Sequence, residues 1–79
     1  MKKKKENKPV ATVRYGVISA SIWKRESDKG AWYSVTLSRS YLDNNEWKHS
    51  DSFGRDELLL VAKVVNEAHA RIYELQAEA

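Results

Sequence analysis

The chain contains no cysteine, and this absence removes two common ways of stabilising a small domain. Disulfide bonds, which cross-link many small secreted scaffolds, cannot form, and no thiolate is present to hold a structural metal. We therefore expect the protein to work in a reducing compartment. A chain of 79 residues makes one domain at most. Because a domain of this size buries only about 60% of the surface that its unfolded form exposes, we expect marginal stability for a monomer.

The sequence also lacks a long apolar run. Four lysines follow Met1, but no apolar stretch of signal-peptide or membrane-span length comes after them. We expect a protein that is neither exported by a signal peptide nor inserted into a membrane. The predicted location is cytoplasmic, at the nucleoid if the source is bacterial.

Residues suited to catalysis or to metal binding are few and scattered. His49 and His69 lie on different expected elements, and neither has a partner at metal-ligand spacing. Gly16, Gly30 and Gly54 form no phosphate-binding loop. The serines alternate along expected strands without an adjacent base. We predict that the protein is not an enzyme and that it uses no metal, no cofactor and no small-molecule substrate.

The net charge of +3 is distributed unevenly along the chain. Residues 1–8 carry five lysines against one glutamate, a balance of +4, whereas residues 54–79 carry three basic against five acidic residues, a balance of −2. A lysine cluster of this kind is typical of a disordered arm that contacts phosphates without reading sequence. We predict such an arm over residues 1–9, with the contacts made by Lys2, Lys3, Lys4 and Lys5. A tail that serves solubility alone is the alternative.

Residues 10–79 are predicted to form a single α+β domain that begins with an antiparallel β-meander. Residues 10–24 are rich in β-branched and aromatic side chains, which suit a half-buried strand. The apolar phase changes at Gly16, which indicates a β-bulge or a break there. Residues 31–41 and 47–53 are the next strands, joined by turns at 26–30 and 43–45. The meander therefore has three to four strands.

One long helix is predicted from Arg55 to about Gln76, because apolar residues recur at spacings of three and four. The recurring residues are Leu58, Val61, Val65, Ala68, Ile72 and Leu75. A helix of about 22 residues spans roughly 33 Å, whereas a strand of about seven residues spans roughly 23 Å. The overhang needs another surface, so we expect a symmetric dimer with part of the helix in the interface. The interface residues expected are Val65, Ala68, Ile72 and Leu75.

A sheet with one helix has two faces, of which the helix covers one. Loops of common length predict that Ile22 lies opposite Val35 and that Tyr41 lies opposite Trp47. The covered face is then predicted to carry Ile18, Ala20, Ile22, Tyr33, Val35, Leu37 and Phe53. The uncovered face is predicted to carry Ser19, Ser21, Trp23, Arg25, Trp32, Ser34, Thr36, Ser38, Lys48, Ser50 and Ser52.

The uncovered face combines tryptophans with hydroxyls and cations, which is typical of surfaces that bind single-stranded nucleic acid. An aromatic ring stacks on a base of any identity, while Lys and Arg follow the phosphates. We predict that Trp23, Arg25, Trp32 and Lys48 bind DNA or RNA in this way. The alternative is that Trp23 and Trp32 pack on each other or on a second subunit.

Three segments resemble the core of the transcriptional coactivator family called positive cofactor four. They are residues 33–41 (YSVTLSRSY), 46–48 (EWK) and 50–58 (SDSFGRDEL), within a similarity that covers roughly residues 13–65. The resemblance implies a homodimer of antiparallel sheets backed by helices, which binds single-stranded or melted DNA with little sequence preference. Carried over by position, it implies nucleic-acid contacts by Trp32, Arg39, Tyr41 and Lys48.

This sequence departs from the family pattern at two points. Gly16 is followed by Val17, where the family usually has a Gly-Lys pair, and the helix is longer and stays apolar as far as Leu75. The predicted function is single-stranded nucleic-acid binding, mainly of DNA, with a coactivator-like role in transcription or replication. The alternative is a small dimeric protein-interaction module that uses Trp23 and Trp32 to bind a protein.

Overall fold

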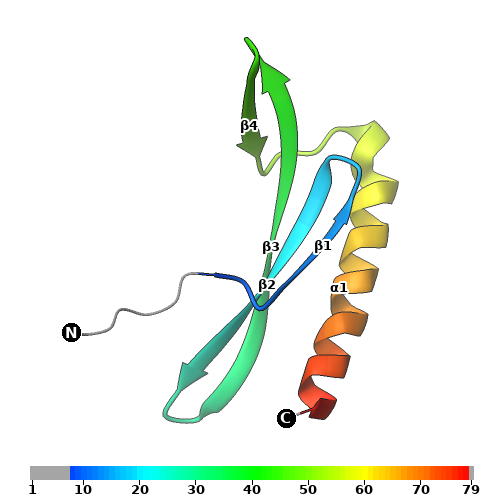
Figure 1. Cartoon of the computed structure of the whole chain (residues 1–79). Coiled ribbons are helices and arrows are strands. Elements are labelled where there is room, and N and C mark those ends of the chain that lie inside the picture. The colour runs from blue at the N-terminus through cyan, green and yellow to red at the C-terminus, as the bar shows by residue number, and fades with distance from the viewer. Residues whose placement is uncertain (1–7, 79) are drawn as a thin grey trace, which may run out of the picture.

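The computed structural model describes residues 8–78, and these form an antiparallel sheet followed by a single long helix (Figure 1). The strands are β1 (Ala11–Tyr15), β2 (Ile18–Ser27), β3 (Gly30–Asp43) and β4 (Glu46–Ser50). A 3₁₀ turn, η1 (Arg55–Glu57), leads into α1 (Leu58–Glu78). The strands lie in the order β1-β2-β3-β4, so the predicted α+β class and β-meander are confirmed. The predicted basic-arm residues Lys2–Lys5 lie outside the described part of the chain.

Gly16 marks a reversal of the chain and not a bulge in one long strand. Tyr15 lies opposite Ile18, which leaves Gly16 and Val17 as a two-residue turn, and β1 pairs antiparallel with β2. Gly16 has φ +61°, as the first central residue of a type II′ hairpin turn requires. A Cβ atom at Gly16 would also lie 3.4 Å from the side chain of Leu60, so this turn packs closely against the helix. The phase change in the sequence was therefore the sign of a hairpin.

The second hairpin confirms the predicted register. Ser27 lies opposite Gly30, so the connecting turn is only Asp28-Lys29, which is shorter than the predicted turn at 26–30. The change in loop length leaves the pairing of the strands unaltered, and Ile22 lies opposite Val35 as expected.

The third hairpin corrects the predicted register by one residue. Asn44 and Asn45 have φ of 53° and 64°, and they form a two-residue turn of the kind that asparagine favours. Tyr41 therefore lies opposite Lys48, and Leu42 lies opposite Trp47. A one-residue shift exchanges the two faces of a strand. The predictions that Lys48 lies on the uncovered face and that Tyr41 lies opposite Trp47 are thus wrong.

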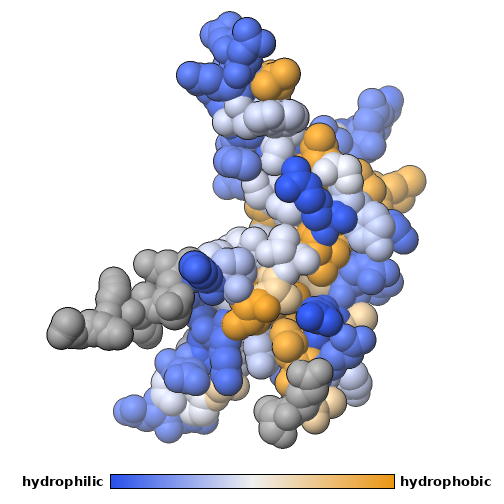
Figure 2. Space-filling view, viewed as in Figure 1, coloured by the Kyte–Doolittle hydropathy of each residue, from blue (hydrophilic) through white to orange (hydrophobic). Residues whose placement is uncertain are grey.

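The helix covers β1 and β2 but leaves much of β3 uncovered on the same side. The core consists of Ile18, Ala20 and Ile22 from β2 with Val64 and Ala68 from α1. Tyr33, Leu37 and Phe53 pack at its margin as partly buried residues, whereas Val35 is 37% exposed, contrary to its predicted place in the core. Figure 2 shows apolar side chains gathered between sheet and helix, with mostly hydrophilic side chains at both ends of the sheet.

The helix was predicted to extend beyond the sheet, and the strand lengths overturn that premise. β2 has 10 residues and β3 has 14, so β3 spans about 46 Å, compared with about 31 Å for the 21 residues of α1. Ile72 and Leu75 pack against the core of the same chain, and Ala68 is only 1% exposed. Dimerisation stays a prediction, but an overhanging helix does not support it.

β3 has a strand partner on both of its edges only at Arg39. β2 pairs with residues 30–39 and β4 pairs with residues 39–43. Within residues 8–78, the edge of β3 that faces away from β2 therefore has no strand partner along residues 30–38.

α1 is not apolar enough over its length to cross a membrane, and the same holds for every helix in the described range.

Candidate nucleic-acid interface

The face of the sheet turned away from the helix, called the open face below, is defined by the strand registers. Its side chains alternate with those that face α1. They are Thr12, Arg14, Ser19, Ser21, Trp23, Arg25, Ser27, Trp32, Ser34, Thr36, Ser38, Ser40, Leu42, Trp47 and His49. Hydroxyl groups, three tryptophans and two arginines thus dominate this surface.

No carboxylate from the four described strands lies on the open face. The three acidic strand residues are Glu26, Asp43 and Glu46, and each pairs in the register of the opposite side. Asp28 lies in a turn and Asp51 follows β4, so both lie outside the strands. The strand residues of the open face therefore contribute only neutral or positive groups.

Trp23, Arg25 and Trp32 form a cluster at one end of the open face, called the tryptophan cluster below. Arg25 lies opposite Trp32 in the register, and its guanidinium group lies 5.6 Å from the centroid of the Trp23 ring. The Trp23 indole N–H donates a hydrogen bond to Thr36 Oγ1 at 2.9 Å. Arg25 Nε donates a hydrogen bond to Ser34 Oγ at 3.0 Å. These bonds fix the orientation of both side chains, while Trp32 remains 50% exposed.

The other three predicted contact residues lie on the helix side. Arg39 lies opposite Ile18 and Ser50, in the same phase as Tyr41 and Lys48. The six predicted nucleic-acid contacts are therefore divided between two faces, three on each. Ser50 faces the helix side as well, and Ser52 lies beyond the end of β4, so neither belongs to the open face as predicted.

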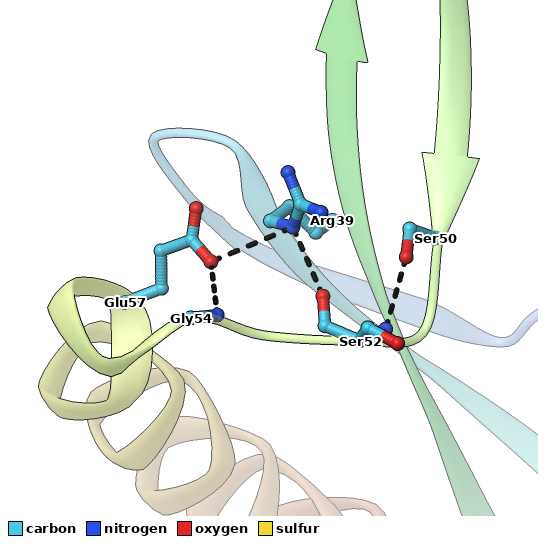
Figure 3. A network of polar contacts seen from close by, with 5 residues as sticks. All are labelled: Arg39, Ser50, Ser52, Gly54 and Glu57. Carbon is cyan, nitrogen blue, oxygen red and sulfur yellow. Dashed lines mark hydrogen bonds and ion pairs between the residues drawn. The ribbon is translucent and has the colours of Figure 1, made fainter.

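The Nε atom of Arg39 is held on the helix side of the sheet, beside the segment that leads into α1 (Figure 3). Its Nε donates a hydrogen bond to the Ser52 carbonyl oxygen at 2.9 Å and lies 3.5 Å from Glu57 Oε1. The same Glu57 oxygen accepts a hydrogen bond from the Gly54 N–H at 2.7 Å, which caps the start of η1. The guanidinium also lies 5.3 Å from the Tyr41 ring centroid. Arg39 thus ties β3 to the start of the helix.

Lys48 is partly neutralised by a neighbour on the same hairpin. Its Nζ lies 3.3 Å from Asp43 Oδ2, and both side chains are about half exposed. An exposed ion pair of this kind contributes little to stability. On the helix side, Lys48 is separated by the sheet from the tryptophan cluster.

Sequence reasoning missed Trp47 and its surroundings. Trp47 is 65% exposed on the open face, opposite Leu42, near the tip of the third hairpin. With Arg14, Ser40 and His49 it lines a shallow depression of about 220 Å³. The pair Asn44-Asn45 was the signal that could have found it, because a two-residue turn there places Trp47 opposite Leu42.

The arrangement offers no site for metal chemistry within the described residues. No group of three or more His, Asp or Glu side chains is placed to hold a metal ion in that part of the chain.

Comparisons of the sequence and structure with known proteins yield no matching family model, no similar curated protein and no similar solved structure.

Proposed function

We propose that the open face binds single-stranded nucleic acid, mainly DNA and with weak sequence preference. The observation that carries the proposal is that a face with three tryptophans and two arginines has no strand carboxylate. Phosphates are repelled by carboxylates and attracted by arginine, and this attraction does not depend on base sequence. A coactivator-like role in transcription or replication fits this kind of binding.

The tryptophan cluster supplies what base stacking needs. Trp32 is 50% exposed, and Trp23 is held in place by its hydrogen bond to Thr36. An exposed aromatic ring such as that of Trp32 can stack on any base, because every base has a π-face. Serine and threonine hydroxyls along the neighbouring strands are suitable partners for phosphate and sugar oxygens. Arg39 and Tyr41 lie on the helix side, with the Arg39 guanidinium group over the Tyr41 ring, and they have no part in this proposed binding.

Replacing Trp32 with Ala should test the stacking contribution. We expect a loss of about 5- to 150-fold in affinity for an unstructured oligothymidylate, the equivalent of one stacked base. The loss should persist at high salt, because stacking releases no counterions. Arg25→Gln should instead give a loss that shrinks as salt rises. Fluorescence anisotropy of a labelled oligonucleotide over a salt series measures both.

The matched control is Tyr73→Ala, which removes an aromatic ring that is 72% exposed on α1, away from the sheet. This variant should bind as the unaltered protein does. A chain that binds neither single-stranded DNA nor RNA at low salt would overturn the proposal, and it would leave a protein-interaction module as the function of the open face. Equal losses in the Trp32 and Tyr73 variants would also count against it.

A further inference from the structure

Arg14, Ser40, Trp47 and His49 come together on the open face although they lie on three different strands. The turn between β1 and β2 is joined to β3 by a hydrogen bond from the Ser40 N–H to the Val17 carbonyl oxygen, at 2.9 Å. This bond places the end of β1 beside the start of the third hairpin. The four side chains then line one depression of about 220 Å³, called the Arg14 pocket below.

The guanidinium group of Arg14 supplies hydrogen-bond donors to the Arg14 pocket. Arg14 Nε donates a hydrogen bond to the Gly16 carbonyl oxygen at 3.3 Å, which holds the guanidinium over the turn. Its two terminal nitrogens form no hydrogen bond or ion pair with another residue of the described range 8–78. Two parallel N–H groups of this kind match the oxygens of a phosphate.

His49 and Ser40 add further hydrogen-bonding capacity. His49 Nδ1 and Ser40 Oγ lie 3.3 Å apart, within hydrogen-bond distance, and this pairing orients the imidazole ring. With Nδ1 engaged, Nε2 is the ring nitrogen left for a ligand. Among residues 8–78, no carboxylate lines the pocket. An anion can therefore enter it without electrostatic repulsion from the lining.

We propose that the Arg14 pocket is a second nucleotide subsite, which holds one phosphodiester of a single strand while a neighbouring base stacks on Trp47. This proposal rests on the proposed function of the open face. Trp23 lies opposite Ser34, and Trp47 lies opposite Leu42, so the two subsites are eight positions apart along β3. That separation is about 26 Å at 3.3 Å per residue. A strand at the stacked spacing of 3.4 Å needs about eight nucleotides to reach both.

Oligonucleotide length tests this subsite. An oligothymidylate of about four nucleotides is shorter than the span of about eight nucleotides, whereas one of about twelve is longer. The unaltered protein should bind the longer one far more tightly, because the second contact becomes intramolecular. In Arg14→Gln and in Trp47→Ala, most of that gain should disappear, with a loss on the order of tenfold or more for the longer oligonucleotide. Binding of the shorter one should change much less.

Arg55→Gln is the matched control, since it removes the same charge from an exposed residue of η1, outside the open face. It should keep the dependence on length. Arg14 and Trp47 are both exposed, so the variants should fold, which far-ultraviolet circular dichroism checks. Variants that keep the full length dependence would overturn the second subsite while the tryptophan cluster stays in place as the binding site. An unaltered protein that binds neither oligonucleotide would overturn both proposals.

Discussion

Arg39 shows how a single residue can fit a functional motif and still have a structural role. The resemblance implied that it contacts nucleic acid, but its Nε is engaged by the Ser52 carbonyl and lies beside Glu57. Both Arg39 and Glu57 side chains are roughly three-quarters buried. At the scale of one residue, a match to a family motif by position in the sequence does not determine which face of the sheet the side chain lies on.

Replacing Arg39 with Ala should therefore lower stability and leave binding intact. The change removes a charge-assisted hydrogen bond and leaves Glu57 without its cation, which should cost about 1.5–3 kcal/mol in the free energy of unfolding. Urea denaturation measures this cost. Lys48→Ala is the comparison, because its exposed ion pair with Asp43 should contribute less than about 1 kcal/mol. A stable Arg39 variant with weakened oligonucleotide binding would instead place nucleic acid on the helix side.

At the scale of the element, the helix was the most predictable part of the chain. Its apolar periodicity placed it from Arg55 to about Gln76, and the structure has η1 and α1 from Arg55 to Glu78. The side of the helix that packs on the sheet was less well determined. The predicted stripe included Val65 and was widened by Val64, and of these two valines only Val64 is buried. A broad apolar stripe is compatible with several rotations about the helix axis, and the sheet selects one.

These two adjacent valines allow a matched test. Val64→Ala removes two methyl groups from a residue that is 0% exposed, and it should cost about 1.5–3 kcal/mol in the free energy of unfolding, including the cavity. Val65→Ala makes the same chemical change at a residue that is 43% exposed, and it should cost less than about 1 kcal/mol in a monomer. Thermal or urea unfolding at low protein concentration gives both values. Equal costs would mean that the helix is rotated from the orientation described above.

The strands were predicted correctly in type and order, but the lengths of the turns determine which side chains lie on the open face. At Gly16 the change in apolar phase correctly predicted an interruption of the strand. It did not distinguish a bulge from a two-residue turn, because a glycine suits both. At Asn44-Asn45 a loop of two residues in place of three moved Trp47 to the open face and Lys48 away from it. Trp23, Arg25 and Trp32 were placed correctly, because their register depends on the second hairpin alone.

At the scale of the whole molecule, the helix leaves an apolar area of the helix side uncovered. Lys63 of α1 lies over the ring of Tyr15 at the end of β1, and the side chain of Leu60 lies beside Gly16 in the turn that follows. Val65 comes two positions after Lys63 and five positions after Leu60. With 3.6 residues per turn, it therefore lies on the opposite flank of the helix. In the strand order β1-β2-β3-β4, β3 follows β2 on the side away from β1, and its residue Val35 is exposed. No local pattern in the sequence reveals which strands one helix covers.

We predict that a second copy of the chain covers this area and that the protein is a symmetric dimer. Sedimentation at high micromolar concentration should give twice the mass of the chain. Val35→Asp should shift the equilibrium toward the monomer, because the change places a charge in an apolar contact. Tyr73→Asp, on the exposed outer side of α1, should leave the dimer intact. A monomeric mass for the unaltered protein would show that the area stays open.

The unpaired edge of β3 has a consequence for the shape of such a dimer. Its backbone N–H and C=O groups along residues 30–38 have hydrogen-bonding capacity that no described strand uses, and edges of this kind accept a strand from another molecule. Two β3 strands paired antiparallel about a twofold axis would merge two sheets into one of eight strands, twice the four of one chain. Because such an axis is perpendicular to the sheet, both open faces would point the same way. A nucleic acid could then pass from one chain to the other without leaving a surface free of strand carboxylates.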